Sequence, residues 1–410
     1  MLLYRFLISL LAPVLAAAML VRTLRGRESW SDFRERLGLW QQQSATKTIW
    51  IHGASNGELT AARTLIEAIA ARRPDADLLI TCNTTTAKAM VRAWSLPRTA
   101  VYLAPLDLRW IYARIIKQRD VQQFILIEAD FWPSRILAAQ GLGVPMALVA
   151  GRMSQNSAKG WARFSNLSNQ VFSAFKVISP QDEAAKARLI ALGANPDAFT
   201  APMALKSHYS STAQPKDHSA RQGLWLAAST HDGEDETLLR AHQMARQALP
   251  DLRLILAPRH PKRATDIADC ARALGLKVSL RSSGAQLDGA SDVYIADTLG
   301  EMELWYQQAG VCFVAGSLAA KGGHTPYEPA FHACAILHGP HLDNFSQEYQ
   351  ALSAQAGALL CETPKDIAAA LVSLQDRASA EKLRDNARRA LAVKSDLTAL
   401  LDKLAPLAKT

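Results

Sequence analysis

The chain has 410 residues, a hydrophobic content of 49% and a formal net charge of +9. This length exceeds one ordinary domain, so two domains of about 200 residues each are expected, and the hydrophobic content excludes a disordered chain. The positive charge favours an anionic membrane surface or an anionic substrate. Nucleic acid is not expected as a partner, because the sequence has no basic block interleaved with aromatic residues and no nucleic-acid-binding motif.

Cysteine and histidine usage gives no sign of a metal site. The five cysteines are scattered without a CxxC pair, which favours reduced cytosolic thiols over a disulfide framework or a zinc site. The ten histidines are dispersed and no HExxH sequence occurs, so neither a metal nor another cofactor is expected. The sequence also lacks a Walker loop and a GxGxxG fingerprint.

The N-terminal run Phe6–Val21 is uncharged and mostly apolar, although shorter than the roughly 20 residues usual for a membrane-spanning helix. Three interpretations stay open: an uncleaved anchor or interfacial helix, a cleaved signal peptide with Ala16–Ala18 as its A-x-A site, and a buried core helix. Only Arg5 precedes the run, whereas Arg22–Arg27 carries three arginines. The positive-inside rule therefore favours an anchor that leaves the body of the protein in the cytoplasm.

Apolar strand-like runs alternate with helical stretches along the whole chain, which predicts parallel sheets covered by helices. A helix is predicted at Leu59–Arg72, where apolar residues recur with a period of 3.6. The predicted strands are Thr48–His52, Leu78–Cys82, Gln123–Ile127, Pro145–Ala150, Lys176–Ser179, Leu224–Ala228, Leu252–Ala257, Asp292–Ala296, Val311–Ala315 and Ala335–His338.

Composition changes predict where the domains begin and end. Residues 1–27 form the hydrophobic anchor and its basic flank, and residues 28–206 form the first Rossmann-like domain. The polar, aperiodic stretch 207–219 is the expected linker. Residues 220–410 form the second domain, which is helical from Pro364 onward. An internal echo supports two similar domains: IWIHGASNGEL and LWLAASTHDGE both read as strand, small-residue loop and Gly-Glu, although chance explains two such turns equally well.

Glu58 is the candidate general base, because it follows a predicted strand and begins a predicted helix, where ligands bind in open α/β sheets. A carboxylate there can accept a proton from an attacking hydroxyl. The structural alternative is a capping box between Ser55 and Glu58. Ser55, Asn56 and Gly57 are candidate contacts to an acceptor.

Glu128 is a further acceptor-side candidate at the end of another predicted strand, in IEADFWPS. Glu128 and Asp130 would orient an acceptor hydroxyl, or they would form structural ion pairs.

The second half carries polar groups at the equivalent positions. Ser229, Thr230 and His231 follow its first predicted strand and are candidate contacts to a donor phosphate or sugar, with helix capping as the alternative. Arg259, in PRHPKR, presents a planar fork that matches phosphate oxygens, whereas a solvated charge run is the alternative. In DTLGE, Gly300 lets backbone approach a ligand and Glu301 begins a helix.

The stretch GSLAAKGGHTPYEP combines a glycine loop with a predicted helix start, which is a ready anion site. Ser317, Gly322 and Gly323 are candidate donor contacts in the loop. We expect Thr325 to cap the helix, Pro326 to occupy its first position, and Glu328 to complete a capping box or bind ribose hydroxyls.

Taken together, these motifs resemble the 3-deoxy-D-manno-octulosonic acid (Kdo) transferases, which move Kdo from CMP-Kdo to lipid A precursors. The resemblance runs from the N-terminal run to about Ala358. The ordered matches are IHGASNGEL, TCNTTTAKAM, YLAPLD, IEADFWPS, GRMSQNS, ISPQDEAAKARLIALGA, AASTHDGEDE, LAPRHPKR, ADTLGEMELWY, AGSLAAKGGHTPYEP and GPHLDNFSQEY.

The resemblance implies a GT-B fold, with two Rossmann-like domains, the acceptor in the N-terminal domain and the donor in the C-terminal domain. It implies a metal-independent, inverting glycosyltransferase at the cytoplasmic face of the inner membrane. Glu58 then matches the family's general base. The matched CMP-binding positions are Pro258, Arg259, Leu299, Gly300, Glu301, Thr325, Pro326, Tyr327 and Glu328.

The chain departs from the family pattern at several positions. Thr325 and Tyr327 replace the asparagine and leucine of N-P-L-E, Ala315 replaces one glycine of G-G-S, and only Lys206 remains of G-N-x-K. EADFWPS stands for E-T-E-L-W-P-N, and AGRMS for N-A-R-L-S. The alternatives are a divergent enzyme with another acceptor or activated sugar, including a UDP-sugar, and a non-catalytic membrane-anchored nucleotide-binding protein.

Overall fold

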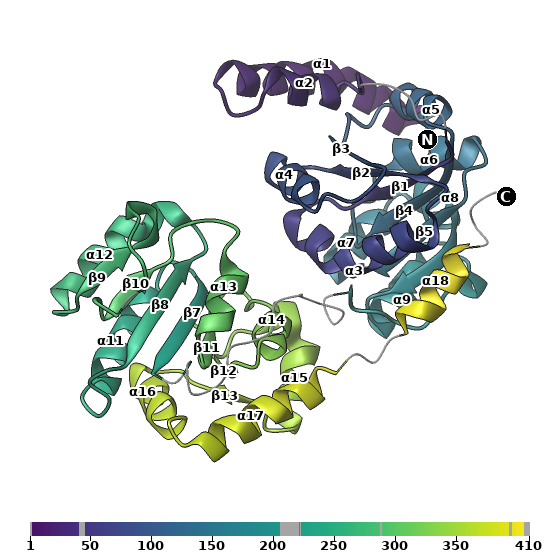
Figure 1. Ribbon diagram of the computed structural model, residues 1–410. Coiled ribbons are helices and arrows are strands. Elements are labelled where there is room, and N and C mark those ends of the chain that lie inside the picture. The colour runs from purple at the N-terminus through teal and green to yellow at the C-terminus, as the bar shows by residue number, and fades with distance from the viewer. Residues whose placement is uncertain are drawn as a thin grey trace. The chain divides into compact units, whose positions relative to one another are not determined.

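The computed structural model describes residues 2–40, 46–205, 221, 223–287, 289–392 and 396–405 (Figure 1). The chain forms two compact units. The first comprises Met1–His208 together with Val393–Thr410, and the second comprises Tyr209–Ala392. The expected linker, 207–219, and Lys206 lie outside the described residues.

The first unit is built on a six-stranded parallel sheet in the order β3-β2-β1-β4-β5-β6. Its strands are β1 (Thr48–His52), β2 (Asp77–Cys82), β3 (Thr99–Leu103), β4 (Val121–Ile127), β5 (Met146–Gly151) and β6 (Phe175–Pro180). Its helices are α1 (Leu2–Leu24), α2 (Trp30–Arg36), α3 (Asn56–Arg72), α4 (Thr85–Ala93), α5 (Arg109–Gln118), α6 (Pro133–Gly141), α7 (Gln155–Ala162), α8 (Ser165–Phe172), α9 (Glu183–Ala191) and α18 (Leu397–Leu404), with the 3-10 turn η1 (Pro196–Ala198).

Both faces of this sheet are buried. Ile49 and Ile51 of β1 belong to a core cluster with α3, α4 and α18, whereas Trp50 between them belongs to a cluster with α5, α6, α8 and α9. Successive side chains of a strand point to opposite faces, so a strand covered on both faces needs apolar residues at every position. This explains why the central strands are recognisable as continuous apolar runs.

The second unit repeats the plan with seven parallel strands in the order β13-β12-β11-β7-β8-β10-β9. The strands are β7 (Leu224–Thr230), β8 (Arg253–Pro258), β9 (Val278–Leu280), β10 (Val293–Ile295), β11 (Val311–Val314), β12 (Ala335–His338) and β13 (Ala358–Leu360). The helices are α11 (Asp235–Ala245), α12 (Ala264–Ala273), α13 (Met302–Gln308), α14 (Tyr327–Phe331), α15 (Ser346–Ala354), α16 (Pro364–Ser373) and α17 (Arg377–Ala390), with 3-10 turns η3 (Pro261–Arg263), η4 (Arg281–Ser283) and η5 (Asp343–Phe345).

The predicted α/β architecture is confirmed, and all ten predicted strands exist with ends shifted by a few residues at most. Three strands escaped prediction: β3, β9 and β13. All three lie at an edge of their sheet, and most of their residues are only half-buried. An edge strand buries less side-chain surface than a central one, so its apolar signal is weaker.

The N-terminal helix α1 continues through Pro13 and exposes its apolar side chains. Of the window from Phe6 to Leu24, which is long and apolar enough to cross a membrane, only 6% is buried. The interpretation as a buried core helix is therefore wrong. Tyr4, near the helix start, donates a 2.6 Å hydrogen bond to Asp107 Oδ2, which fixes this end of α1 to the first unit.

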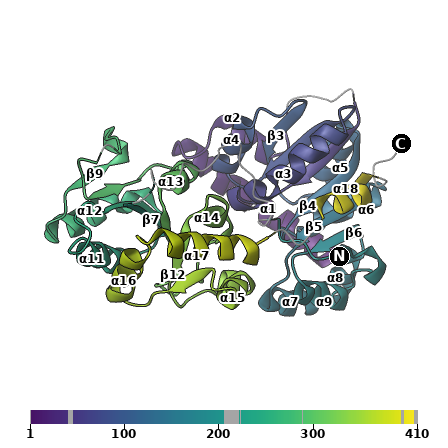
Figure 2. The same ribbon diagram turned by 60° about the horizontal axis from the view of Figure 1, so that its bottom comes forward.

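The C-terminal helix α18 packs on the first unit, whereas the predicted boundary assigned residues 220–410 to the second domain. Leu400, Leu401 and Leu404 join the core cluster of β1 and α3, and Gln123 Nε2 donates to the Leu404 carbonyl at 3.0 Å. Figures 1 and 2 both show α18, in yellow, among the helices of the first unit. The sequence predicted the helix but held no signal for the unit on which it packs.

This packing predicts that Leu401→Ala destabilises the first unit by about 2 kcal/mol, because it leaves a cavity in the core. Hydrogen exchange should accelerate in β1 and β4 and stay unchanged in β7. The matched control is Asp402→Ala, which removes only an exposed ion pair with Arg72 and should cost about 0.5 kcal/mol or less. Equal effects of the two substitutions would contradict this account of α18.

Candidate active site

In the first unit the strand order reverses between β1 and β4, since the chain continues from β1 to β2 on one side and from β3 to β4 on the other. Open α/β sheets bind ligands at the carboxyl ends of the strands at such a point. Glu58 follows β1, and Glu128 follows β4 directly. The structure thus brings together the candidate base and the acceptor-side candidate from the second motif.

Glu58 lies in the first turn of α3, where it makes structural hydrogen bonds and has a carboxyl group with a shifted pKa. Ser55 Oγ caps the helix by accepting from Glu58 N at 3.2 Å, and Glu58 Oε2 accepts from Ala54 N at 2.6 Å. The predicted capping box is therefore only partly formed, because the carboxylate accepts from the Ala54 N–H rather than from the backbone N–H of the cap residue Ser55. The Ser55 side chain makes a further hydrogen bond to the Glu58 carboxylate.

The electrostatic setting of Glu58 suits proton transfer near neutral pH. Burial raises the pKa of its carboxyl group to about 7, and the carboxylates of Glu128 and Asp130 act in the same direction, against the hydrogen bond from Ala54. A general base works best when its pKa is close to the working pH. Glu58 therefore combines a hydrogen bond that holds the turn before α3 with a carboxyl group that can accept a proton near neutral pH.

Glu128 lies in a strained backbone conformation with φ of +57°. Non-glycine residues in this region cost on the order of 1–3 kcal/mol and cluster at functional sites. The half-buried Glu128 carboxylate has no hydrogen-bond or ion-pair partner within the part of the chain that the structure describes, so it is available to a ligand hydroxyl.

Asp130, in contrast, is fully engaged. His52 Nε2 lies 2.7 Å from Oδ2, Asn83 and Arg135 donate to the same oxygen at 3.2 Å, and the Trp132 indole donates to Oδ1 at 2.9 Å. Although burial opposes ionisation, these donors hold the pKa of Asp130 well below its usual range. Of the two interpretations of this carboxylate, structural pairing is the one that the geometry supports.

The buried His52 was not singled out from the sequence, yet its tautomer is fixed by a directed chain of hydrogen bonds. The ionised Asp130 carboxylate can only accept, so the neutral His52 ring carries its proton on Nε2, and Nδ1 accepts from Thr81 Oγ1 at 2.8 Å while Thr81 accepts from the Trp50 indole at 2.9 Å. The proton on Nε2 then points to Asp130. Burial and the Arg135 charge lower the pKa of His52 to about 4, which keeps the ring neutral.

The other acceptor-side candidates have distinct surroundings. Asn56 Oδ1 accepts from Thr84 and Thr86 hydroxyls at 3.2 Å and 2.9 Å, which joins the start of α3 to the start of α4. Gly57 is exposed, and a Cβ there would meet only Ser55 Oγ, at 3.9 Å. Asn56 thus has a structural role, while Gly57 leaves the approach to Glu58 open.

In the second unit the strand order reverses between β7 and β11, and a histidine follows each strand. The rings of His231 and His324 stack at 5.1 Å, with their Nε2 atoms 3.0 Å apart. At this separation one Nε2 donates and the other accepts, and burial lowers the pKa of His231. His260, from the loop after β8, lies 6.3 Å from the His231 ring.

Several predicted donor contacts are corrected by the structure. The side chains of Thr230 and Ser317 are completely buried, and Ser317 Oγ both donates to Val314 O and accepts from Gly339 N, so neither can touch a ligand. Gly322 and Gly323 are also buried, with φ of +82° and +73°. A Cβ on Gly322 would lie 2.6 Å from Asn344, which shows that this glycine serves loop packing.

Ser229 remains available at the carboxyl end of β7. It is half-buried and has a φ of +61°, at a register shift between Ala228 and Thr230. Among the described residues, Ser229, Glu128 and Ala150 are the non-glycine residues with a positive φ at the carboxyl end of a strand. Strain at such positions is a feature of ligand sites.

Glu234 joins the loops after β7 and β11 through four backbone N–H groups. It is completely buried, and its carboxylate accepts from the N–H groups of His231, Gly316, Leu318 and Ala319 at 2.8–3.3 Å. These groups belong to the loops after β7 and β11. In the sequence, the only indication of Glu234 is the Gly-Glu pair that follows a predicted strand in both halves of the chain.

The two arginines of PRHPKR differ in their contacts: Arg259 is exposed, whereas Arg263 forms an ion pair. Arg259 is exposed, and its backbone N–H donates to Thr230 O at 3.0 Å, which positions it directly after the buried Pro258. Arg263 instead pairs with Asp235 and donates to Thr230 O. Arg259 is therefore available to a phosphate, whereas the charge of Arg263 is neutralised within the fold.

In DTLGE, Glu301 is held by a residue outside the motif. Arg281 of η4 donates to both carboxylate oxygens of Glu301, at 3.1 Å and 2.7 Å, and Thr298 donates to one of them. Leu299 is 72% exposed and Gly300 has a φ of +87°, so the tip of this loop presents backbone and an apolar side chain to solvent. The distance of Arg281 from the motif explains why the sequence did not reveal it.

The start of α14 differs from the predicted capping box. The helix begins at Tyr327, one residue later than predicted, and Pro326 is its cap residue without a side-chain contact. Thr325 Oγ1 accepts from Tyr327 N at 3.4 Å, so it satisfies a helix N–H weakly. Glu328 lies half-buried in the first turn, where its carboxylate does not serve as the partner of a cap residue.

Among residues 2–40, 46–205, 221, 223–287, 289–392 and 396–405, no group of three or more His, Cys, Asp or Glu side chains has an arrangement that would hold a metal ion. The chemistry assembled at the two sheet edges is that of carboxylates, imidazoles and an arginine.

The raised pKa of Glu58 predicts that Glu58→Gln stabilises the protein at alkaline pH. The folded-state pKa of about 7 exceeds the unfolded value, so ionisation costs folding free energy that grows as pH rises from about 4.5 to 7. Urea unfolding should show a gain of about 2 kcal/mol at pH 8 and almost none at pH 4. A gain in the free energy of unfolding that is the same at both pH values would contradict the raised pKa of Glu58.

Glu234→Gln is the contrasting variant. Its amide would place a donor against backbone N–H groups that need an acceptor, so a loss of about 2–4 kcal/mol is expected at pH 8. A gain from both substitutions would show that the two glutamates are not distinguished by their hydrogen bonds.

Comparisons with known proteins agree with the motifs. Residues 31–208 match the family model described as 3-deoxy-D-manno-octulosonic-acid transferase (kdotransferase). A probable mitochondrial 3-deoxy-D-manno-octulosonic acid transferase of Arabidopsis thaliana is 32% identical over 369 residues, which cover 85% of this chain and 82% of that protein. The corresponding transferase of Bordetella pertussis is 30% identical over 373 residues and 85% of each chain.

Solved structures support the fold. UDP-GlcNAc 2-epimerase from Neisseria meningitidis, solved with UDP-GlcNAc, aligns with 88% of this chain and 100% of its own, with a TM-score of 0.58 and 12% sequence identity. At this identity the likeness shows the GT-B fold alone. With the ordered motifs and the relatives at 30% identity or more, the chain belongs to the 3-deoxy-D-manno-octulosonic acid transferase family and is a glycosyltransferase of the GT-B type.

Proposed function

We propose that the enzyme transfers Kdo from CMP-Kdo to a hydroxyl of a lipid A precursor, with inversion at the anomeric carbon. Family membership supports Kdo as the transferred sugar. The observation that carries the mechanism is Glu58, whose pKa is raised to about 7 at the reversal point of the first sheet. Lipopolysaccharide core biosynthesis is the pathway that this reaction serves.

In the proposed reaction Glu58 accepts the proton of the acceptor hydroxyl as its oxygen attacks the anomeric carbon of Kdo. The bond between that carbon and the phosphate oxygen breaks, and CMP leaves with the bonding electrons. Glu128 accepts a hydrogen bond from an acceptor hydroxyl and so orients it. The neutral His52 and Arg135 keep Asp130 ionised and fixed beside this edge, which maintains the field that raises the pKa of Glu58.

On the donor side, we propose that Arg259 binds the CMP phosphate and that the loops carrying Leu299–Glu301 and Thr325–Glu328 bind the nucleoside. Arg259 is supported by its exposure next to the reversal point of the second sheet. An arginine at the phosphate stabilises the charge that grows on the leaving group. The pairing of Glu301 with Arg281 makes its position independent of the ligand.

We also propose that α1 holds the enzyme at the cytoplasmic face of the inner membrane. The exposed apolar window of α1 and the arginines that follow it support this location. An anchored enzyme meets a lipid acceptor within the membrane surface, where both are concentrated.

Glu58→Gln should abolish transfer while leaving CMP affinity within about twofold of wild type, because the base contacts the acceptor and not the nucleotide. The measurement is mass spectrometry of a tetraacylated lipid A precursor incubated with CMP-Kdo generated in situ. For the wild type, kcat/KM should fall as pH decreases through about 7. Loss of CMP binding in the variant would refute this separation of roles.

Arg259→Ala should weaken CMP binding by roughly 10- to 100-fold, since it removes a charge-assisted contact to phosphate. The matched control is Lys262→Ala, which removes the same charge from an exposed position three residues away and should change affinity less than about threefold. Isothermal titration with CMP and with UDP measures both. Equal losses would mean that general positive potential, rather than Arg259 itself, binds the nucleotide, and preference for UDP would contradict CMP-Kdo as donor.

A further inference from the structure

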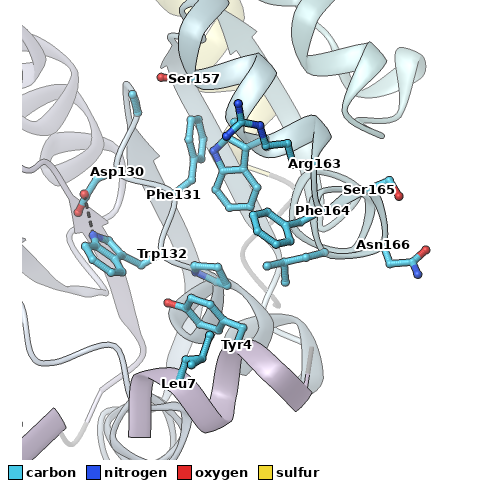
Figure 3. A pocket seen from close by; sticks show the side chains of 15 residues that line it. Tyr4, Leu7, Asp130, Phe131, Trp132, Ser157, Arg163, Phe164, Ser165 and Asn166 are labelled. Carbon is cyan, nitrogen blue, oxygen red and sulfur yellow. Dashed lines mark hydrogen bonds between the residues drawn. The ribbon is translucent and has the colours of Figure 1, made fainter. Parts of the chain in front are cut away.

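A large apolar cavity of about 780 Å³ lies in the first unit, beside the β4–α6 loop (Figure 3). Its walls come from α1, from residues 129–133 of that loop, and from α7 and the start of α8. Its volume is within the range of roughly 300–1,000 Å³ typical of small-molecule sites.

The side chains that face the cavity are mostly aromatic or aliphatic. Trp132 and Phe164 are 43% and 61% exposed at its mouth, and Trp161 and Phe131 pack behind them against Phe172. Exposed aromatic side chains gathered around a hollow mark a binding site for an apolar group.

The N-terminal helix forms one wall of the cavity. Tyr4 and Leu7 face it, and the Tyr4 hydroxyl bonds to Asp107, which in turn accepts from the backbone N–H groups of Ser134 and Arg135. This chain of contacts fixes the helix against the β4–α6 loop. Phe6, Leu10 and Leu11 of α1 are exposed as well, so apolar surface extends beyond the part of the helix that lines the cavity.

The cavity and the candidate active site share the loop that follows β4. Asp130 lines the cavity, while Glu128, two residues earlier on the same loop, lies at the strand end beside Glu58. The charges of both acids act on Glu58. A single short loop therefore separates the carboxylate that accepts a proton from the hollow that accepts an apolar chain, which matches a molecule with a polar head and an acyl tail.

We propose that this cavity binds an acyl chain of the acceptor and so positions the acceptor hydroxyl at Glu58, an inference that rests on the proposed function. The cavity thus gives the enzyme selectivity for an acylated acceptor over the same sugar without its acyl chains. An anchored helix beside the cavity mouth delivers the chain directly from the lipid phase.

Gly160 offers a precise test, because it lines the cavity from the exposed helix α7 and a Cβ there meets nothing within 4 Å. Gly160→Phe should fill the cavity without disturbing the fold, and replacing a helical glycine is favourable in itself. Gly160→Ala is the matched control that leaves the cavity open. Both variants are made in the full chain, and thermal unfolding verifies that they fold.

The first measurement is the affinity for a fluorescent fatty acid, 11-(dansylamino)undecanoic acid. Gly160→Phe should lower it roughly tenfold or more, since each methylene excluded costs about fourfold. The second is kcat/KM in mixed micelles for a tetraacylated lipid A precursor and for the same disaccharide without acyl chains. The variant should lose roughly tenfold with the acylated acceptor and less than about twofold with the other, because remote binding energy aligns the reacting group.

Unchanged fatty-acid affinity in Gly160→Phe, or an equal loss with both acceptors, would overturn the proposal. A loss in Gly160→Ala as large as in Gly160→Phe would overturn it too, because that change leaves the cavity open. Failure of the proposed function is a separate result: the wild type would then transfer Kdo to neither acceptor, while fatty-acid binding would still decide whether the cavity takes an acyl chain.

Discussion

The carboxylate of Glu234 accepts four backbone N–H groups from the two loops that flank the reversal point of the second sheet, and the geometry of the donor edge depends on it. Burying a charge is costly unless hydrogen bonds satisfy it, and here backbone donors supply that satisfaction. With this contact in place, His231 and His324 are held ring against ring, and Arg259 projects from the adjacent strand end. The loops are therefore organised by the protein itself before any nucleotide binds.

Glu58 occupies the corresponding turn in the first unit. The two glutamates differ in the number of hydrogen bonds that their carboxylates accept. Glu58 accepts one backbone N–H through Oε2 and lies near two further carboxylates, so burial acts without full compensation and its pKa rises to about 7. The same strand–turn–helix unit thus yields a structural anchor where four backbone donors converge and a carboxyl group with a raised pKa where fewer donors are present. An ionised carboxylate with few donors is less stable, which is the property that the proposed general base requires.

How far the sequence predicts this molecule depends on whether a signal is local. The central strands and the position of Glu58 near a helix start follow from short patterns and are where predicted, whereas α14 begins one residue later than predicted. Edge strands such as β9 are missed because one-sided burial weakens the apolar pattern, and Ser317 and Thr230 were proposed as ligand contacts because burial cannot be read from residue type. The partners that fix the site, Arg281 for Glu301 and Thr81 for His52, come from distant segments that only the fold brings together.

The two units differ in which of their candidate groups are held in place by the protein itself. In the second unit, Glu234, the Arg281–Glu301 pair and Asn344 fix the loops after β7, β10 and β11, which suits a charged ligand that must be bound in one orientation. In the first unit the rigid part is the network around Asp130, whereas the Glu128 carboxylate has no hydrogen-bond or ion-pair partner among the described residues and Glu58 has few donors for a buried carboxylate. In the reaction that we propose, the acceptor hydroxyls supply the missing donors, and binding the apolar part of the acceptor at a distance aligns these hydroxyls with Glu58.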